Sequence, residues 1–392
     1  MTMGRAIGGT VEKVRSIAQA PGLSDVDGHA LAGFIEAEGC FTITPNNGGR
    51  NWKCAMSLVQ RADDVDMIGD IVRVTGLGRL HPRPACGNSH PQVGWSVASK
   101  VECRELVRLL RRYPLRGRKS EEFRVWSGAV DEWADTLYGS SRPGTDRVIR
   151  ACATDLLRLR CYVDSSRPIG NADGLLPFLG GFFTGEGSFR LDTAASTCIH
   201  LRADDRGLLE ALRDAFDVGV VRTSTPRGAH PTARWHVCRQ AQLPRLIATL
   251  DAAILRGRKR REFDAWRRGA IEFTRGRRRD RAALASAREA LMGARAYVER
   301  PLPPPPHRSA RDAYAEVLRA FADEAADGLL STNAYKRARE RHPDWPTRNT
   351  IARAFGSWAQ ALRAAELAPS VASGEESSVS WARGSSGRSV SV

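Results

Sequence analysis

The chain has 392 residues, with 60 lysines and arginines against 44 aspartates and glutamates, and therefore a formal net charge of +16. This balance predicts a polyanionic partner, most often nucleic acid. Hydrophobic residues make up 42% of the chain, which supports folded cores and argues against a disordered basic tail. No stretch approaches the ~20 apolar residues of a membrane-spanning helix, so we expect a cytoplasmic protein without a membrane partner.

Residues 1–27 are predicted to form an N-terminal arm. The next segment opens with Leu31-Ala-Gly-Phe-Ile-Glu-Ala-Glu-Gly39, an apolar stretch of helical length that ends in an acid and a glycine. Gly33 and Ala37 are four residues apart, so they share one helix face. A face of small residues allows the backbone of a second helix to approach closely.

Alternating apolar and polar residues then predict two β-hairpins, each followed by an amphipathic helix. The predicted strands are residues 40–44, 52–60, 78–82 and 92–98, and the predicted helices are residues 63–75 and 100–112. The turn Leu115-Arg-Gly-Arg-Lys119 leads into the last helix of this segment, which we place at residues 28–135.

The same order returns at residues 175–274, after a predicted linker at residues 136–174. Leu179-Gly-Gly-Phe-Phe-Thr-Gly-Glu-Gly187 is a second copy of the acidic motif, and Leu255-Arg-Gly-Arg-Lys259 repeats the turn. Such a duplication predicts an α+β fold of two pseudo-symmetric αββαββα repeats, whose antiparallel sheets together form a saddle. The basic helix predicted within the linker either touches phosphate or only connects the two repeats.

Glu38 and Glu186 end the two motif copies, and they should meet if the small-residue faces pack on each other. Both acids would then lie at the C-terminal ends of helices, where the macrodipole is negative and cations are favoured. Two carboxylates in one place must repel, shift their pKa values or share metal ions. The alternative is a pair of buried helices whose acids are only exposed ends; one copy favours that interpretation, but two matching copies do not.

The first motif resembles the LAGLIDADG motif of homing endonucleases, with Glu in place of Asp at its sixth and eighth positions. The second is similar but departs further, because Gly180 stands for alanine and Thr184 replaces the sixth-position acid. The resemblance covers roughly residues 28 to 274 and implies a monomeric, pseudo-dimeric enzyme that cuts both strands of DNA at a long asymmetric site and leaves 3′ overhangs. It implies that the eighth-position acids, Glu38 and Glu186, bind the catalytic metal. Oxygen ligands favour Mg²⁺, with Mn²⁺ tolerated.

The resemblance also implies basic and amide side chains around the attacking water. The repeated turns supply two candidate lysines and two rival arginines, Lys119, Lys259, Arg118 and Arg258. Gln60 matches a position where the family often carries a water-positioning glutamine, whereas its counterpart Leu201 cannot do this, which predicts unequal cleavage of the two strands. Alternatively, the turns only grip phosphate and lie outside the chemistry.

The predicted sheets carry many basic side chains on their hairpins and polar faces. A two-stranded ribbon fits the major groove of DNA, where arginine, asparagine and glutamine read base edges. The predicted DNA-binding residues are Arg50, Lys53, Arg61, Arg79, Arg83, Arg118, Arg190, Arg202, Arg222, Arg227, Arg234 and Arg258. The alternative is a solvated face, which antiparallel sheets commonly have.

The C-terminal third contains a further unit. A basic and proline-rich linker is predicted at residues 275–307, a small all-α unit at residues 308–367 and a disordered tail at residues 368–392. Phe355-Gly-Ser-Trp358 resembles a short helical repeat that is often appended to homing endonucleases. We therefore expect this unit to bind DNA, with protein docking as the alternative.

Two other functions fit the same scaffold. One is a DNA-binding regulator that has lost cleavage, and the other is a maturase whose partner is intron RNA. Two retained eighth-position acids argue against the regulator, because a protein that only binds DNA has no need of paired carboxylates facing phosphates. They do not exclude a maturase. An active enzyme of this kind would be cytoplasmic and associated with the nucleoid when bound to DNA.

Overall fold

The computed structural model describes most of the chain and divides it into two compact units, residues 1–306 and 307–392, which we treat separately. The described residues are 23–46, 51–85, 89–135, 143–163, 173–276, 280–300, 310–325, 330–342 and 345–367. The predicted N-terminal arm, the proline-rich stretch, the tail and Arg50 therefore lie largely or wholly outside them. Within these ranges, no helix has both the length and the apolar character needed to cross a membrane.

The first unit contains the predicted duplication. The first repeat comprises α2 (Asp25–Glu38), β1 (Cys40–Asn46), β2 (Asn51–Arg61), α3 (Val65–Thr75), β3 (Arg79–Arg83), β4 (Gln92–Val97), α4 (Lys100–Arg112) and α5 (Arg118–Ala134). The second comprises α7 (Leu175–Glu186), β5 (Ser188–Leu191), β6 (Ala195–Arg202), α8 (Arg206–Phe216), β7 (Val220–Ser224), β8 (Thr232–Val237), α9 (Leu243–Ala253) and α10 (Gly257–Thr274). Their antiparallel sheets have the matching orders β1-β2-β4-β3 and β5-β6-β8-β7. The predicted α+β fold with two αββαββα repeats is confirmed.

Four buried tryptophans hold equivalent places in the two repeats. The indole nitrogens of Trp95 and Trp235 each donate to a backbone carbonyl at 2.8 Å, before strands β3 and β7 respectively. Trp126 on α5 and Trp266 on α10 donate to carbonyls of β1 and β5. Because each ring is buried with its polar group satisfied, the tryptophans fix each sheet to its helices in the same way in both repeats.

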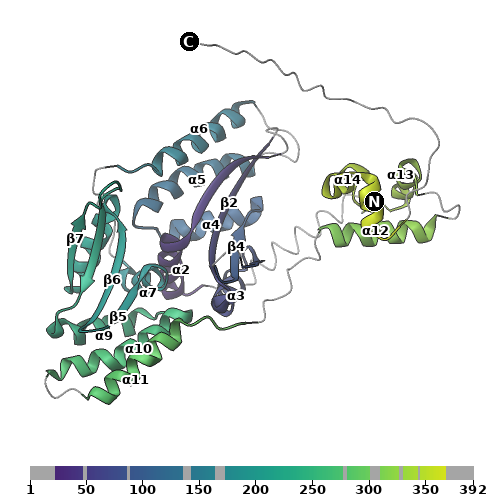
Figure 1. Cartoon of the computed structure of the whole chain (residues 1–392). Helices are drawn as coiled ribbons and strands as arrows, with labels where there is room; N and C mark the ends of the chain where they lie inside the picture. Colours follow the sequence, from purple (N-terminus) through teal and green to yellow (C-terminus); the bar gives the residue numbers. More distant parts are fainter. Residues whose placement is uncertain are drawn as a thin grey trace, which may run out of the picture. The chain divides into compact units, whose positions relative to one another are not determined.

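The two motif helices, α2 and α7, pack along each other between the two sheets (Figure 1). Their backbones approach so closely that a Cβ atom at Gly33 would collide with the carbonyl oxygen of Phe178, and one at Gly181 with that of Ala30. A Cβ atom at Gly185 would collide with the side-chain methyl group of Ala37. The predicted contact through small residues is therefore present.

Each repeat continues into one more helix. After α5 comes α6 (Pro143–Leu159), and after α10 comes α11 (Arg281–Arg295), which packs against α10 as α6 packs against α5. Arg160, just beyond α6, donates to the carbonyl of Phe41, and Arg295 at the end of α11 donates to that of Phe189. Since these contacts are equivalent, we infer that the repeats extend through α6 and α11, the helices that we had placed in linkers.

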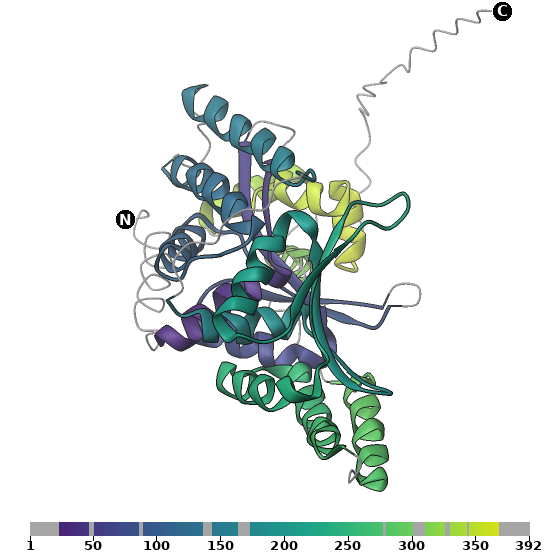
Figure 2. The same ribbon diagram turned by 90° about the vertical axis from the view of Figure 1, so that its left-hand side faces the viewer.

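The ends of these extensions contact the opposite repeat. The helices themselves lie far apart, with α6 at the top and α11 at the bottom of the view in Figure 2. Arg202 of the second repeat donates to the carbonyl of Arg160 at 2.7 Å, and Arg61 of the first donates to that of Arg295 at 2.9 Å. The next aromatic residues also cross: the ring of Tyr162 stacks on His230 and that of Tyr297 stacks on His90. The two repeats are thus joined by equivalent contacts that involve backbone carbonyls, arginine side chains and aromatic rings.

The second unit is all-α, as predicted. It contains α12 (Ala310–Glu324), α13 (Thr332–Arg341), α14 (Arg348–Phe355) and α15 (Trp358–Ala364). Ser331, Thr347 and Ser357 accept backbone N–H groups at the starts of the last three helices, which satisfies donors that a helix leaves free. A core of its own, centred on Leu318 and Tyr335, holds the unit together.

The helix contact leads to a test of stability. Gly181→Ala should lower the free energy of unfolding by about 1–3 kcal/mol or more, because the added methyl group overpacks against backbone that cannot move aside. Gly128→Ala on α5 is the matched control, since a Cβ atom there meets nothing within 4 Å; it should be neutral or stabilising by up to ~1 kcal/mol. Urea denaturation followed by circular dichroism measures both. Equal stability of Gly181→Ala and wild type would contradict the packing.

Candidate active site and nucleic-acid interface

Glu38 and Glu186 lie together at the C-terminal ends of α2 and α7. A Cβ atom on Gly185, next to Glu186, would be only 3.3 Å from the Oε1 atom of Glu38. Burial, and secondly the charge of Glu38, raise the pKa of Glu186 to about 7, although Lys119 and Lys259 act in the opposite direction. The ionised form of this carboxylate is therefore unfavourable unless a further cation is present.

The sixth-position residues support the two turns. Glu36 is 6% exposed, and its carboxylate accepts the backbone N–H groups of Arg116 at 2.8 Å, Gly117 at 3.0 Å and Lys119 at 3.2 Å. Burial raises its pKa, with a smaller contribution from Asp205. Glu36 thus holds the Arg-Gly-Arg-Lys turn at the N-terminus of α5, where free N–H groups favour an acceptor.

Thr184 supports the equivalent turn of the second repeat, but it accepts fewer backbone N–H groups than Glu36 does. Its hydroxyl accepts the N–H of Arg256 at 3.2 Å and donates to the carbonyl of Gly180 at 2.6 Å. One hydroxyl therefore replaces a carboxylate that accepts three N–H groups in the first repeat. The replacement of an acid by threonine is explained, because this position supports a turn and does not belong to the acid pair.

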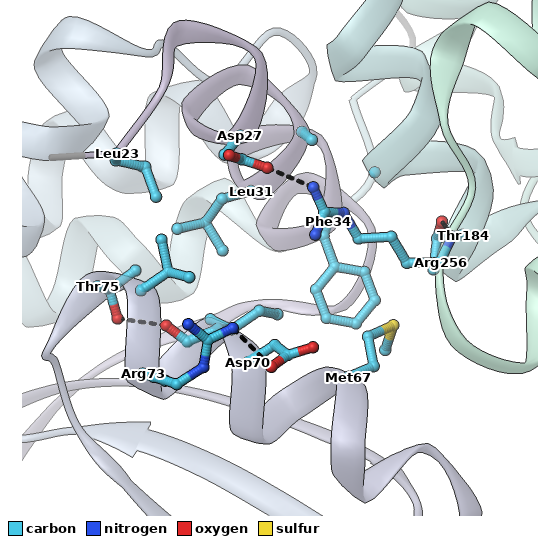
Figure 3. A pocket seen from close by; sticks show the side chains of 14 residues that line it. Leu23, Asp27, Leu31, Phe34, Met67, Asp70, Arg73, Thr75, Thr184 and Arg256 are labelled. Atoms are coloured by element: carbon cyan, nitrogen blue, oxygen red, sulfur yellow. Dashed lines mark hydrogen bonds and ion pairs between the residues drawn. The ribbon is translucent and has the colours of Figure 1, made fainter. Parts of the chain in front are cut away.

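The first arginine of each turn, Arg116 or Arg256, has different surroundings in the two repeats. Arg256 lines a cavity of about 260 Å³ between α2, α3 and α7, where it forms an ion pair with Asp27 (Figure 3). Its counterpart Arg116 is buried over the ring of Phe178, with 5.2 Å from its guanidinium carbon to the ring centre. Phe178 occupies the place that Ala30 has in the first repeat, so a phenylalanine ring lies beneath Arg116 where Arg256 has only a methyl group at the equivalent position.

Each turn is completed by an aspartate from the other repeat. Asp205 accepts the N–H of Arg118 at 2.6 Å, and Asp64 accepts the N–H of Arg258 at 2.6 Å. Burial is the main cause of a raised pKa at both aspartates. This role was not predicted from the sequence, although the repeated Arg-Ala-Asp-Asp pattern contains both aspartates.

The two candidate lysines lie at the ends of the motif helices. Lys119 Nζ donates to the carbonyl of Ala37 at 2.7 Å, and Lys259 Nζ donates to that of Gly187 at 2.6 Å. These are places where helix carbonyls lack partners and a cation is favoured. Burial lowers the pKa of both lysines. Both ammonium groups are close enough to Glu186 to affect its pKa.

The rival arginines point into intramolecular ion pairs. The guanidinium of Arg118 pairs with Glu122 on its own helix, and that of Arg258 pairs with Glu262. Each is also 3.7 Å from the aspartate that caps its turn. Of the adjacent arginine and lysine that end each turn, the lysine is thus the one directed at the carbonyl end of the motif helix.

The strand register makes Gln60 and Leu201 equivalent. Gln60 on β2 is opposite Val93, and Leu201 on β6 is opposite Ala233 at the matching place in the second sheet. Leu201 lines a cavity of about 300 Å³ together with Glu186 and Lys119. The cavity beside Glu186 is therefore lined by the apolar side chain of Leu201, whereas the equivalent position of the first repeat carries the amide side chain of Gln60.

The predicted DNA-binding residues fall into two groups. Arg61 and Arg202 are engaged within the protein, each with an aspartate two residues later and with the cross-repeat carbonyls, as Arg118 and Arg258 are with their glutamates. The exposed group lies on strands and hairpins and consists of Lys53, Arg79, Arg83, Arg190, Arg222, Arg227 and Arg234. Charge alone did not distinguish these groups.

Most of the exposed arginine and lysine side chains on the sheets lack the ion-pair partners that arginines on the helices have. On α4, α5 and α6, for example, Arg111, Arg124 and Arg158 each pair with an aspartate or glutamate. By contrast, no described carboxylate forms an ion pair with Lys53, Arg83, Arg190, Arg222, Arg227 or Arg234. The sheets therefore concentrate positive charge that is not neutralised, which is the electrostatic arrangement expected for contact with a polyanion.

Comparisons with known proteins agree with this geometry. Residues 31–130 match the family model described as LAGLIDADG endonuclease. This match assigns residues 31–130 to the LAGLIDADG endonuclease family. The match spans the first motif helix, the first sheet and most of α5, and the second repeat has the same architecture. Among curated proteins, none matches the chain significantly.

Solved structures of LAGLIDADG homing endonucleases share the fold. I-SmaMI bound to cleaved DNA is 18% identical with a TM-score of 0.56, over 68% of this chain and 96% of that one. I-GzeII in complex with its DNA target is 17% identical with a TM-score of 0.56, over 69% and 99%. The meganuclease I-AabMI bound to uncleaved DNA is 17% identical with a TM-score of 0.54, over 68% and 98%. At this identity, the likeness establishes the LAGLIDADG fold.

The raised pKa of Glu186 predicts a dependence of stability on pH. The folded pKa, about 7, lies above the ordinary value of 4.5, so this group's contribution to stability is complete below pH 4.5 and is lost as the pH rises through 7. Without metal, Glu186→Gln should therefore gain thermal stability relative to wild type across this interval. Glu132→Gln on the exposed face of α5 is the control. Unfolding curves of wild type and Glu186→Gln that stay parallel at all pH values would contradict the prediction.

Proposed function

We propose that this protein is a site-specific endonuclease that hydrolyses both strands of DNA at a long asymmetric site, requires Mg²⁺ with Mn²⁺ tolerated, and leaves 3′ overhangs. The observation that carries the proposal is the meeting of Glu38 and Glu186 at the ends of two closely packed helices. The raised pKa of Glu186 supports it, since a carboxylate whose charge is disfavoured gains most from a bound cation. I-SmaMI has been solved with an uncleaved DNA target in the presence of calcium ions.

Glu38 and Glu186 are the proposed metal ligands. Among the described residues, no group of three or more His, Cys, Asp and Glu could hold a metal ion alone. Two acids suit a site that is completed by phosphate oxygens of bound DNA, since Mg²⁺ is typically bound by one or two carboxylates together with substrate phosphates. A bound divalent ion supplies charge neutralisation at the phosphate and lowers the pKa of a bound water.

The chain's own residues position the remaining groups. We assign Lys119 and Lys259 to the phosphate and the attacking water, because burial lowers their pKa values towards the range useful for proton transfer. Gln60 is assigned to hold the water for one strand. Leu201 offers no such hydrogen bond, so the two strands should be cut at unequal rates.

Double-stranded DNA is the proposed partner of the sheets, and the chain acts as a monomeric pseudo-dimer. The seven exposed cations of the strands and hairpins would contact DNA directly. Arg61, Arg118, Arg202 and Arg258 are assigned a supporting role, because their guanidinium groups are already paired within the protein. Intron RNA remains the alternative partner for a maturase, which would use the same unneutralised charge.

The metal-ligand assignment predicts loss of cleavage without loss of binding. Glu38→Gln and Glu186→Gln should each slow double-strand cleavage on the order of 100-fold or more, the usual effect of removing a preorganised electrostatic group. Binding measured in Ca²⁺ should survive. A randomised DNA library cleaved in Mg²⁺ provides the substrate, and Glu132→Gln is the matched control.

The outcomes separate the candidate functions. Undiminished cleavage by either variant would remove the site assignment. Wild-type protein that binds specific DNA but does not cleave it in Mg²⁺ would favour the regulator. Binding to a structured intron RNA in preference to duplex DNA would favour the maturase.

The second unit is proposed to extend the DNA contact. Lys336 and Arg337 are exposed on α13 without an ion-pair partner among the described residues. Removal of residues 308–392 should weaken DNA affinity or narrow the footprint, while the cut position stays the same. The full-length double variant Lys336→Ala, Arg337→Ala should reproduce part of the loss. Footprinting in Ca²⁺ and mapping of the cut in Mg²⁺ test this, and a displaced cut would place the unit in the catalytic core.

A further inference from the structure

The exposed faces of the two sheets differ in chemistry although their registers match. On the second sheet, Arg222, Arg234 and His200 are direct neighbours across strands β7, β8 and β6. The equivalent row on the first sheet is His81, Gly94 and Val59. A row with two arginines and a histidine thus corresponds to a row with one histidine, a glycine and a valine.

The adjacent positions continue this difference. His236 and Arg190 of the second sheet correspond to Ser96 and Thr42 of the first. A groove of about 650 Å³ on the second sheet is lined by these basic residues, together with small polar side chains. The cations of the first sheet belong to its margins, to the edge strand β3 and the far end of β2, although the side chain of Arg83 reaches to Gly94 on β4.

The basic row is unfavourable for the protein by itself. Arg222 and Arg234 are directly opposite each other on neighbouring strands, and like charges in this relation are destabilising. Neither forms an ion pair with a described carboxylate. The position on the sheet also matters, because Arg234 and His200 belong to the inner strands β8 and β6. Side chains on the inner strands of a ribbon in the major groove reach base edges, while edge strands and hairpin ends are nearer to phosphates.

We infer that the half of the DNA target beneath the second sheet is rich in guanine and that the half beneath the first sheet is rich in adenine and thymine. Arginine binds the O6 and N7 atoms of guanine with two hydrogen bonds, the commonest specific contact in the major groove. The inner strands of the first sheet present Ala55, Val59 and Gly94, which has no side chain and is buried beside Arg83 of the edge strand. Small apolar side chains fit the methyl group of thymine in an A·T pair. This inference rests on the proposed function and specifies its substrate.

The equivalence of Arg234 and Gly94 provides a matched pair of variants. Arg234→Gly removes the central guanidinium from the second sheet, and Gly94→Arg places one at the same position on the first. A Cβ atom at Gly94 would make only ordinary contacts, the nearest at 3.6 Å, and its backbone has no positive φ angle. The substitution should therefore be accommodated, and thermal unfolding checks this for both variants.

The experiment is selection of bound sequences from a randomised duplex library by the full-length protein in Ca²⁺, followed by sequencing. Wild type should enrich an asymmetric site with guanine concentrated in one half. Arg234→Gly should reduce the preference for guanine at one or two positions in that half by about 5-fold to 100-fold, the range for one bidentate contact. Gly94→Arg should create a guanine preference in the other half.

Three results are distinguishable. Guanine enrichment that shifts between halves with the two variants supports the inference. An enriched site without a guanine-rich half, or one that both folded variants leave unchanged, overturns the inference but leaves the endonuclease proposal intact. Failure of the wild type to retain any duplex DNA overturns both.

Discussion

The close contact between α2 and α7 is the constraint on which the rest of the structure depends. Gly33 and Gly181 are required there because the opposing atoms are backbone carbonyls, which cannot move aside as a side chain would. The same contact brings the last residues of both helices, Glu38 and Glu186, to one place. Without a cation, this is electrostatically unfavourable, as the raised pKa of Glu186 indicates. The packing and the site therefore have one cause: two helices that can approach only through glycine, each ending in an acid.

Around this contact, each repeat provides hydrogen-bonding side chains that complete loops and helix ends of the other repeat. Asp64 and Asp205 complete the turn of the opposite repeat, and Arg61 and Arg202 bind carbonyls beyond the last helix of the opposite repeat. Neither Arg-Gly-Arg-Lys turn is fully hydrogen-bonded by its own half. Since the turns carry Lys119 and Lys259, the position of each lysine depends on both repeats. Relative movement of the repeats would therefore disturb both lysines together.

Local patterns predicted most of the fold. Strand alternation, the duplicated motif and the repeated turns were sufficient for two αββαββα repeats and for a helix contact through small residues. They were less informative where a partner is distant in sequence. The charge of Arg61, which led to its prediction as a DNA-binding residue, is visible in a sequence, whereas its hydrogen bond to the carbonyl of Arg295 is not. The helices α6 and α11 were placed in linkers, although Arg160-Cys-Tyr-Val and Arg295-Ala-Tyr-Val already marked them as repeated.

The differences between the repeats are as informative as the likenesses. Residues that hold the framework are the same in both halves, as with Trp95 and Trp235 or the paired capping aspartates. Residues that differ, such as Gln60 and Leu201 or Gly94 and Arg234, have side chains that face the acid site or the open side of a sheet. Fusion in one chain permits this, because each half can change its contact surface without changing that of the other. A symmetric dimer would present the same surface twice and would favour a palindromic site. The unequal sheets of this chain would therefore suit the asymmetric target that we propose.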